Sequence, residues 1–429
     1  MDIRISRSPE FGGTVRAVAS KSAAHRMLIS AAFADRETLL ECPEKSKDIK
    51  RTAECLSALG ASVTETESGY RISPVKELPK KAILDCGESG TTYRFMLSLV
   101  SALGVDAELI GHGRLPSRPL SPLYEVLSEN GVRISEKGSN PLTVAGCLSG
   151  TEFSFPGNVS SQYASGLLLA FPFLANRQST SVSLTLTGKI ESLPYLDMTL
   201  LTMQEFGVSV RKEWLSGGEL RFTVSPAVYR SKGSLAVEGD YSGAAFYLAS
   251  GALGSRSVRL TNLNPCSAQG DRQILTLLRE FGAQVDEAED GITVSSAPLK
   301  GIQIDAAQIP DLVPILAVLA AGANGETHIY NAARLRLKES DRLETVHRMI
   351  ETLGGKIIEG EDDLIIHGNG RLTGGTVSAE NDHRIAMSAA IAALISDDPV
   401  CILGAECADK SYPSFWEDAV SLGFCVTEL

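Results

Sequence analysis

The chain has 429 residues, of which 43% are apolar and 21% are charged, and its net charge is −12. This composition is typical of a soluble globular protein, and the length suggests two or three domains. The negative charge and the lack of any basic run argue against nucleic acid or an anionic membrane as a partner.

The first residues, MDIRISRSPEFGG, lack the apolar stretch of a signal peptide. The longest apolar stretch, around residues 312–321, is too short to cross a bilayer. We therefore expect a cytoplasmic protein. The eight cysteines form no CxxC pair and no HExxH motif is present, so we expect free thiols, no metal and no cofactor.

A helix-like run that ends in glycine and continues into a β-branched strand recurs six times along the chain. The copies are ECLSALGASV, EVLSENGVRI, LTMQEFGVSV, TLLREFGAQV, MIETLGGKII and AVSLGFCV, with the glycines at Gly60, Gly131, Gly207, Gly282, Gly354 and Gly423. Their separations lie between 69 and 76 residues, so six similar units fill the chain. Each glycine is typical of a helix C-terminus, where the backbone adopts a left-handed conformation.

Repeats of this size are supersecondary units that pack against one another. Because helices alternate with strands, the repeats predict a mixed α/β fold with three units in each of two domains. Gly-rich segments at residues 10–14 and 230–240 mark the expected passages between the domains. We expect a discontinuous domain of residues 1–12 and 236–429, and a second domain of residues 13–235.

Cations recur at or just before expected helix starts, where the helix dipole disfavours them. The segments, in chain order, are SKSAAHR (20–26), ESGTTYRF (88–95), GHGRLPSRP (111–119), RLRLKESDRL (334–343), NDHR (381–384) and ADKSYPSF (408–415), and SSQY (160–163) adds three side-chain hydrogen-bonding groups. Any one of them is explained equally well by a solvated helix end or a structural ion pair. Their recurrence favours an anionic ligand, because helix N-termini and arginine both bind phosphate and carboxylate.

Three side chains are candidates for acid–base chemistry. Asp311 lies beside a long apolar run, although an Asp after Pro is also a common helix N-cap. Glu339 stands between Lys338 and Arg342, which favour its ionised form, and His383 stands beside Arg384.

Ten short motifs, in order and nearly from end to end, make the chain resemble the family of 5-enolpyruvylshikimate-3-phosphate synthases, or 3-phosphoshikimate 1-carboxyvinyltransferases. They are SKSAAHR, SGTTYR, SRP, SSQY, ESLPYLDMTL, VEGDYSGAAFYLA, IPDLVPILA, LKESDRL, NDHRIAMSAA and DKSYPSF. The resemblance implies a two-domain inside-out α/β barrel of six βαβαββ repeats, with helix N-termini facing an active site in the interdomain cleft. This agrees with the sixfold repeat found independently.

The resemblance also implies a reaction and its partners. Enolpyruvyl transferases of this family move the enolpyruvyl group of phosphoenolpyruvate to the 5-hydroxyl of shikimate 3-phosphate and release phosphate. This is a step of the shikimate pathway toward chorismate and aromatic amino acids, and it is the target of glyphosate. We expect a monomer that binds these two anionic small molecules.

The family motifs imply roles for individual residues. The shikimate 3-phosphate contacts would be Lys21, Ser22, Arg26, Ser160, Ser161, Gln162, Ser192, Tyr195, Asp311 and Lys338. The phosphoenolpyruvate contacts would be Lys21, Gly90, Thr91, Arg118, Gln162, Glu339, Arg342, His383, Arg384 and Lys410. The catalytic groups would be Asp311, as the base on the attacking hydroxyl, with Lys21 and Glu339 as candidates for proton transfer at the enolpyruvyl methylene.

The chain departs from the family pattern at several of these positions. His25 stands where the family often has Asn, and Glu88 and Ser89 replace a frequent Asn-Ala. Phe95 stands where some members have Pro. Arg334 replaces an Asn that contacts shikimate 3-phosphate in some members, and we do not assign that contact to Arg334.

Two alternatives to this function remain open. The related enolpyruvyl transferase acting on UDP-N-acetylglucosamine uses a loop cysteine, but this chain has Gly113 there, and Ser22 where that enzyme has Asn. A non-catalytic repeat protein that binds phosphorylated metabolites would not need Asp311, Lys21 and Glu339, all of which are present.

Overall fold

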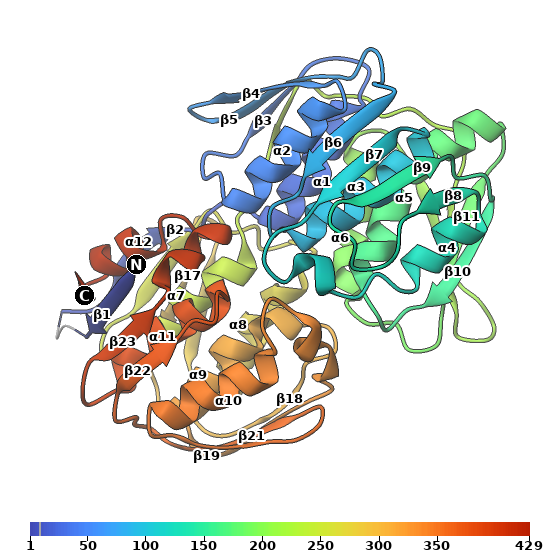
Figure 1. Ribbon diagram of the computed structural model, residues 1–429. Helices are drawn as coiled ribbons and strands as arrows, with labels where there is room; N and C mark the ends of the chain where they lie inside the picture. The colour runs from blue at the N-terminus through green and yellow to red at the C-terminus, as the bar shows by residue number, and fades with distance from the viewer. Residues whose placement is uncertain (8–9) are drawn as a thin grey trace. The chain divides into compact units, whose positions relative to one another are not determined.

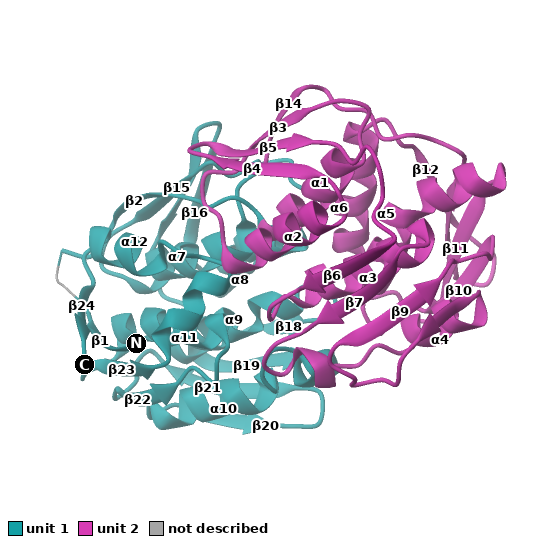
Figure 2. Ribbon diagram, turned by 45° about the horizontal axis from the view of Figure 1, so that its top comes forward, with its two compact units in different colours: residues 1–20, 238–429 teal, residues 21–237 magenta. Residues whose placement is uncertain are grey.

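A computed structural model describes residues 1–7 and 10–429 and divides them into two compact units. Unit 1 consists of residues 1–20 and 238–429, and unit 2 of residues 21–237 (Figure 2). The chain therefore leaves unit 1 after Ser20, whereas we expected the passage after residue 12. The difference arises because strand β2 (Gly13–Arg16) pairs in parallel with β15 (Val258–Thr261), so the segment after the Gly-rich turn still belongs to unit 1.

Six four-stranded sheets, three in each unit, share one topology (Figure 1). In the second repeat, β6 (Lys81–Asp85) and β7 (Asp106–Ile110) are parallel and are joined through helix α3 (Gly90–Leu103). The hairpin of β8 (Val132–Ile134) and β9 (Leu142–Gly146) follows helix α4 (Leu123–Glu129), and β9 inserts between β7 and β8. A parallel pair needs such a helical crossover, whereas the antiparallel pair needs only a short turn. This confirms the predicted βαβαββ repeat.

The other five sheets have the same arrangement in space, but in two of them one strand is out of chain order: β14 takes the edge place beside β3, and β1 lies between β23 and β24. Unit 2 contains β14 (Ser234–Ala236), β3 (Thr38–Glu41), β5 (Gly69–Ser73) and β4 (Ser62–Thr66) in one further sheet, and β10 (Glu152–Pro156), β11 (Val182–Thr187), β13 (Leu220–Val224) and β12 (Val210–Trp214) in another. Unit 1 contains β2, β15, β17 (Gly291–Ser295) and β16 (Gln284–Ala288); β18 (Gln303–Asp305), β19 (Asn324–Tyr330), β21 (Leu364–Asn369) and β20 (Lys356–Glu359); and β22 (Gly375–Ser378), β23 (Val400–Leu403), β1 (Asp2–Ser6) and β24 (Cys425–Glu428).

The helices are of two kinds, which alternate along the chain. The first helix of each repeat is almost entirely buried, as expected of a helix that is apolar or small-residue on every face. These helices are α1 (Lys21–Ala32), α3, α5 (Ser161–Gln178), α7 (Tyr241–Leu253), α9 (Val313–Gly322) and α11 (His383–Ala392). The second helix of each repeat is partly exposed: α2 (Lys47–Ala58), α4 (Leu123–Glu129), α6 (Leu193–Glu205), α8 (Ile274–Phe281), α10 (Arg342–Thr352) and α12 (Phe415–Ser421).

Each unit places its first-of-repeat helices inside and its sheets outside. Strands such as β6 and β10 alternate exposed and buried residues, so one face of the sheet packs on the helices and the other meets solvent. Within unit 2, α3 packs against α5, and within unit 1, α9 packs against α7 and α11. This is the inside-out arrangement that the resemblance implied.

The six repeat glycines all have positive φ, from 79° at Gly207 to 115° at Gly282. Each lies at or directly after a helix C-cap, as predicted, because only glycine adopts this conformation without strain. All eight cysteines are free thiols. Over residues 1–7 and 10–429, no helix is long and apolar enough to cross a membrane, and no cluster of His, Cys, Asp and Glu could hold a metal.

Candidate active site

The residues singled out from the sequence form two groups, one in each unit. Unit 2 carries Lys21, Ser22, Arg26, Gly90, Thr91, Arg118, Ser160, Ser161, Gln162, Ser192 and Tyr195, and unit 1 carries Asp311, Lys338, Glu339, Arg342, His383, Arg384 and Lys410. Most of them stand in the first turn of a helix or within two residues of one. Helix starts leave backbone N–H groups without intrahelical partners, and the two groups therefore suit anionic ligands.

At the start of α1, two cations are stabilised in different ways. The Lys21 ammonium pairs with the Asp48 carboxylate at 2.9 Å. The buried Arg26 guanidinium donates instead to neutral oxygens: Thr199 Oγ1 at 2.7 Å, the Ser22 carbonyl at 2.7 Å, the Tyr195 carbonyl at 3.0 Å and Ser165 Oγ at 3.2 Å. Burial lowers the pKa of Arg26 to about 10. Arg26 thus joins the segments that carry Ser22 and Tyr195.

The starts of α3 and α5 are tied together by Gln162. Its Nε2 donates to Thr91 Oγ1 at 2.9 Å, and its Oε1 accepts from Arg94 Nη1 at 2.6 Å. Arg94 also donates to the Pro119 carbonyl at 3.4 Å, which brings in the loop that carries Arg118. Arg94 was recognised in the sequence as a cation of this motif but received no role, since sequence does not reveal such a bridge.

Two guanidinium groups, those of Arg94 and Arg118, lie close to Gly90. A Cβ added at this position would stand 2.6 Å from Arg94 Nη1 and 2.9 Å from Arg118 Nη1. Glycine therefore permits the close approach of both arginines to the first turn of α3.

The remaining side chains of the unit 2 group stand at the starts of α5 and α6. Ser160 is the N-cap of α5 and accepts from the Gln162 backbone N–H at 3.3 Å. Ser192 precedes α6 with φ 53°, a left-handed conformation that is uncommon for serine, and Tyr195 lies in the first turn. Non-glycine residues in this region cluster at functional sites, which agrees with the expected role of Ser192.

In unit 1, one carboxylate is held by three cations. Asp311 Oδ1 is 2.8 Å from Arg342 Nη1 and 3.1 Å from Lys338 Nζ, and Asp311 Oδ2 is 3.4 Å from Arg384 Nη2. Burial raises the pKa of Asp311, but Arg384, Lys338 and Arg342 outweigh burial and hold the pKa well below its usual range. The N-cap of α9 is Leu312, so Asp311 does not occupy the capping position that sequence left open.

Arg342 is 1% exposed and is the centre of this group. Besides Asp311 it contacts the Glu339 carboxylate at 2.7 Å and the fully buried Asp382 carboxylate at 2.8 Å. Burial opposes the charge of Arg342, yet the carboxylates of Asp382, Glu339 and Asp311 raise its pKa. Asp382 also caps α11 by accepting from the Arg384 backbone N–H at 3.0 Å. Asp382 was not expected from sequence, although its place in the NDHR motif is a usable signal.

His383, Arg384 and Lys410 complete the unit 1 group. His383 begins α11 and is buried, and Arg384 Nη1 donates to the Asp311 carbonyl at 3.0 Å. Lys410, at the end of the 3-10 helix η6 (Ala405–Lys410), donates to the Asn381 carbonyl at 2.8 Å. The structure therefore brings the DKSYPSF and NDHR motifs to one place.

A second buried carboxylate near Asp311 was not expected from sequence. Asp271, in the 3-10 helix η2 (Gly270–Gln273), is 2% exposed, and its Oδ2 accepts a hydrogen bond from Ser242 Oγ. Burial and the charge of Asp311 raise the pKa of Asp271 to about 7, against the opposing effect of Arg384.

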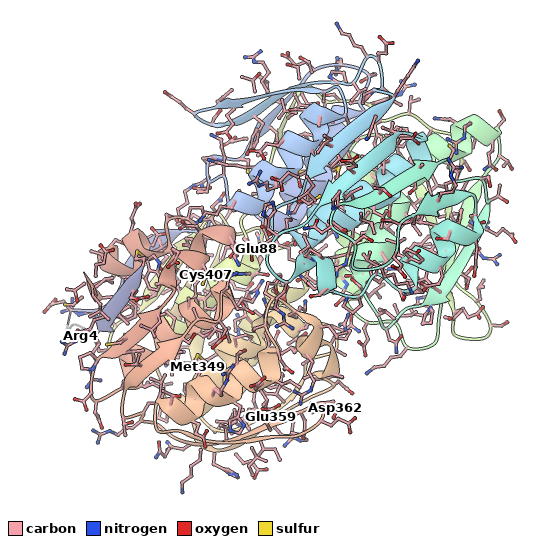
Figure 3. All side chains as sticks on the ribbon, viewed as in Figure 1. Arg4, Glu88, Met349, Glu359, Asp362 and Cys407 are labelled. Carbon is pink, nitrogen blue, oxygen red and sulfur yellow. The ribbon has the colours of Figure 1, made fainter. Side chains whose placement is uncertain are left out.

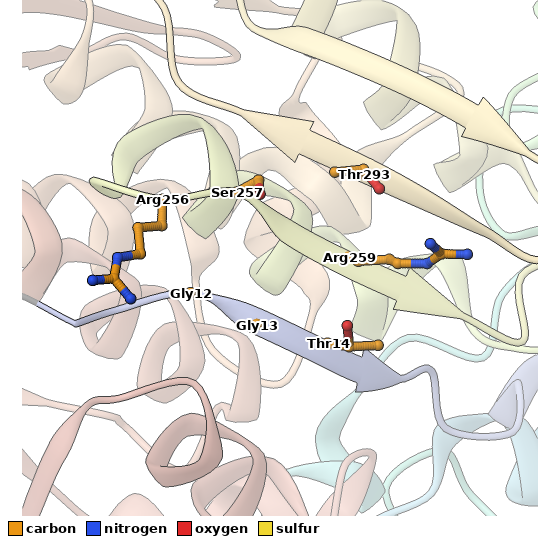
Figure 4. Close-up of a pocket in the computed structure, with 7 residues that line it drawn as sticks. All are labelled: Gly12, Gly13, Thr14, Arg256, Ser257, Arg259 and Thr293. Carbon is orange, nitrogen blue, oxygen red and sulfur yellow. The ribbon is translucent and has the colours of Figure 1, made fainter.

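A hollow of about 480 Å³ on unit 1 contains none of the expected residues (Figure 4). It lies on β2, β15 and β17 and is lined by Gly12, Gly13, Thr14, Arg256, Ser257, Arg259 and Thr293. Its two arginines are paired, Arg256 with Glu10 and Arg259 with Asp290. We assign no site to this hollow because its charges are offset by acidic neighbours.

The fold places the chain among the enolpyruvyl transferases. A solved structure of the enolpyruvyl transferase NikO from Streptomyces tendae is similar in fold, with a TM-score of 0.76 over 99% of this chain and 98% of that one, although only 18% of residues are identical. EPSP synthase from Acinetobacter baumannii matches more closely, with a TM-score of 0.81, 26% identity and full coverage of both chains.

Sequence comparison identifies the family within this class. Residues 6–419 match the family EPSP synthase (3-phosphoshikimate 1-carboxyvinyltransferase). Relatives with that enzyme name are 39% identical: one from Clostridium kluyveri over 96% of this chain and 95% of the relative, and one from Clostridium acetobutylicum over 97% and 96%. The chain belongs to the EPSP synthase family.

Proposed function

We propose that this chain is a 3-phosphoshikimate 1-carboxyvinyltransferase, which transfers the enolpyruvyl group of phosphoenolpyruvate to the 5-hydroxyl of shikimate 3-phosphate and releases phosphate. The observation that carries the proposal is the Asp311 carboxylate held by three cations, in a chain of this family. Both substrates are anions, and both groups of residues offer cations at helix starts.

We assign the two substrates to residues of both groups. Shikimate 3-phosphate binds the hydroxyl, amide and cationic groups at the starts of α1, α5 and α6. Phosphoenolpyruvate binds Arg118, Gly90 and Thr91 of unit 2 and the cations Arg342, Arg384 and Lys410 of unit 1. Arg26, which already donates four hydrogen bonds within unit 2, acts mainly by fixing Ser22 and Tyr195.

Asp311 accepts the proton of the attacking 5-hydroxyl. In the free protein its pKa lies well below the usual range, because Arg384, Lys338 and Arg342 favour the carboxylate, and such a group is a weak base. An anion that binds Arg342 and Arg384 offsets their charge and raises the pKa of Asp311. The base thus becomes stronger when phosphoenolpyruvate is present.

Proton transfer at the enolpyruvyl methylene needs an acid and then a base. The methylene carbon gains a proton while the 5-oxygen bonds to the adjacent carbon, and the methyl group later loses a proton as the C–O bond to phosphate breaks. Lys21 is an ammonium paired with Asp48 and suits the first step, whereas Glu339 is a carboxylate paired with Arg342 and suits the second. The cations around both substrates stabilise the charge that develops.

The alternative acceptor, UDP-N-acetylglucosamine, is not favoured. The related enzyme would place a cysteine at Gly113, but Gly113 has φ +55°, and an added Cβ would stand 3.1 Å from Cδ of Glu88. A cysteine there would be strained and would press on Glu88, which is labelled in Figure 3.

The test is phosphate release by the purified protein with both substrates, and with each omitted in turn. Release that requires both supports the proposal. Release with UDP-N-acetylglucosamine in place of shikimate 3-phosphate, or no release at all, would contradict it. Asp311→Asn is the matched control, because it keeps the size of the side chain but removes the base.

We further propose that the protein acts as a cytoplasmic monomer that does not bind nucleic acid. The net charge of −12 and the small, phosphorylated substrates support this proposal. Light scattering coupled to gel filtration tests the oligomeric state; a dimer mass would contradict it.

A further inference from the structure

Four buried polar side chains form a continuous hydrogen-bonded chain across α1, α2 and α3 in unit 2. His25 Nδ1 lies 2.6 Å from Thr52 Oγ1, which lies 2.7 Å from Thr92 Oγ1, and Thr92 Oγ1 donates to Ser89 Oγ at 2.7 Å. None of the four side chains reaches solvent. Hydrogen bonds between buried side chains are electrostatically stronger than in water, so these three bonds tie the starts of the helices together.

The donor and the acceptor of each hydrogen bond in this network follow from the bond between Thr92 and Ser89. Because the Thr92 hydroxyl donates to Ser89, it must accept from Thr52, and the Thr52 hydroxyl must in turn accept from His25 Nδ1–H. His25 therefore carries its proton on Nδ1. Burial, Lys21 and Arg26 lower the pKa of His25 well below its usual value, so the imidazole is neutral, and its buried Nε2 has no hydrogen-bond partner.

The two ends of this hydrogen-bonded network, His25 and Ser89, lie near the starts of α1 and α3, which carry candidate-site residues. His25 is one turn after Lys21 on α1. Ser89 is the N-cap of α3, accepts from the Thr92 backbone N–H at 3.2 Å and directly precedes Gly90 and Thr91. His25 and Ser89 are both departures from the family pattern, and the structure joins them through Thr52 and Thr92.

We propose that His25, Thr52, Thr92 and Ser89 are positioning residues that hold the Gly90–Thr91 turn at a fixed distance from Lys21. The proposal rests on the proposed function, in which Gly90 and Thr91 contact phosphoenolpyruvate and Lys21 protonates its methylene carbon. These four side chains touch neither substrate. They set the geometry of the unit 2 half of the phosphoenolpyruvate subsite, so their loss weakens phosphoenolpyruvate binding more than shikimate 3-phosphate binding.

The test compares three variants with the parent protein. Thr52→Val keeps the shape of the side chain but breaks two of the hydrogen bonds, and Thr52→Ser keeps the hydroxyl. Ser101→Ala removes a buried hydroxyl at the far end of α3 that donates to the Leu97 carbonyl. We expect Thr52→Val to raise the KM for phosphoenolpyruvate about tenfold, since small misplacements of binding groups cost this much or more. We expect kcat and the KM for shikimate 3-phosphate to stay within about twofold, and Thr52→Ser and Ser101→Ala to behave like the parent.

Several outcomes would overturn the proposal. An unchanged KM for phosphoenolpyruvate in a folded Thr52→Val protein would contradict it. So would a KM raised as much by Ser101→Ala, or a Thr52→Ser protein whose KM is as high as that of Thr52→Val. Nitrogen NMR of the histidine side chains gives a readout independent of activity. A proton on Nε2 of His25 would contradict the hydrogen-bonded network described above. If the parent protein itself releases no phosphate, the proposed function fails, while the NMR result still decides whether the hydrogen-bonded network exists.

Discussion

Asp311 combines two properties, and a single substitution affects both. Its carboxylate is the proposed base, and it also neutralises part of the charge of Lys338, Arg342 and Arg384. A carboxylate with a depressed pKa contributes stability above its unfolded pKa, and that contribution is lost as the pH falls through the folded value. Asp311 is thus worth most to the fold at neutral pH.

We expect Asp311→Ala to lower kcat by two or more orders of magnitude, because the attacking hydroxyl loses its base. It should also lower the free energy of unfolding at pH 7 by about 1–3 kcal/mol, because buried cations lose a partner. Phosphate release and urea unfolding measure the two effects. Near-normal turnover in a folded variant would assign Asp311 a purely structural role.

Gly90→Ala should discriminate between two ligands of different length. The added methyl group meets Arg94 and Arg118, and a methyl group forced into a packed site costs about 1–3 kcal/mol. Glyphosate is longer than phosphoenolpyruvate and should be affected more. We expect the inhibition constant of glyphosate to rise further than the KM for phosphoenolpyruvate. Equal increases would show that Gly90 does not limit ligand length.

The raised pKa of Asp271 predicts that its contribution to stability changes with pH in the opposite direction to that of Asp311. Its folded pKa, about 7, lies above the unfolded value near 3.9, so the folded state holds the extra proton and loses stability as the pH rises between these values. Asp271→Asn removes this loss. We expect the variant to gain stability relative to the parent between pH 5 and pH 8, measured by urea unfolding at both. A difference that does not change with pH would contradict the raised pKa.

At the scale of the elements, the alternation of helix, glycine and strand could be predicted from the sequence because it depends on local backbone preferences. The left-handed glycines and the sixfold repeat follow from it, whereas the βαβαββ order was implied by the family resemblance. The end of the N-terminal segment could not be predicted, because the Gly-rich residues 10–14 lead into β2 instead of ending the domain. Only the pairing of β2 with β15 shows that β2 stays in unit 1.

The same contrast applies to the site. Cations at helix starts were visible in sequence, and they correctly marked the segments that meet within each unit. The partners were not visible: Arg26 binds carbonyl and hydroxyl oxygens of α1, α5 and α6, and Asp382 comes from a different motif than the Arg342 that it orients. Such contacts depend on packing between distant repeats, which no local pattern encodes.

Arg26→Lys tests how far one side chain holds the starts of these helices together. An ammonium cannot reproduce the planar, four-bond arrangement of the guanidinium. We expect a loss of about 1–3 kcal/mol in the free energy of unfolding, together with a higher KM for shikimate 3-phosphate. Unchanged stability with a raised KM would mean that Arg26 acts by direct contact alone.

At the scale of the whole molecule, two chain passages connect the units. Their flanking segments are hydrogen-bonded to each other, with Ser20 N–H donating to the Glu238 carbonyl and Asp240 N–H to the Val18 carbonyl, both at 2.8 Å. The first passage leads into α1 and the second leads, after residues 238–240, into α7.

We expect the radius of gyration to fall when shikimate 3-phosphate and an inhibitor are added together, because the proposed substrates contact residues of both units. Small-angle X-ray scattering measures the change, and shikimate 3-phosphate alone shows how much of it one ligand causes. A radius that stays constant under all conditions would argue against closure.

The pairing of β1 has a consequence for the order in which the protein is made. β1 is translated before β2 to β24, yet its neighbours β23 and β24 emerge from the ribosome about 400 residues later, since Ile3 pairs with Ile402 and Glu428. Unit 2 is complete once residue 237 has been translated, whereas the last sheet of unit 1 has to wait for the final strand. At 5–20 residues per second this delay is about 20–80 seconds. During this time β1 is an unpaired nascent segment with free strand edges, the kind of segment that chaperones protect.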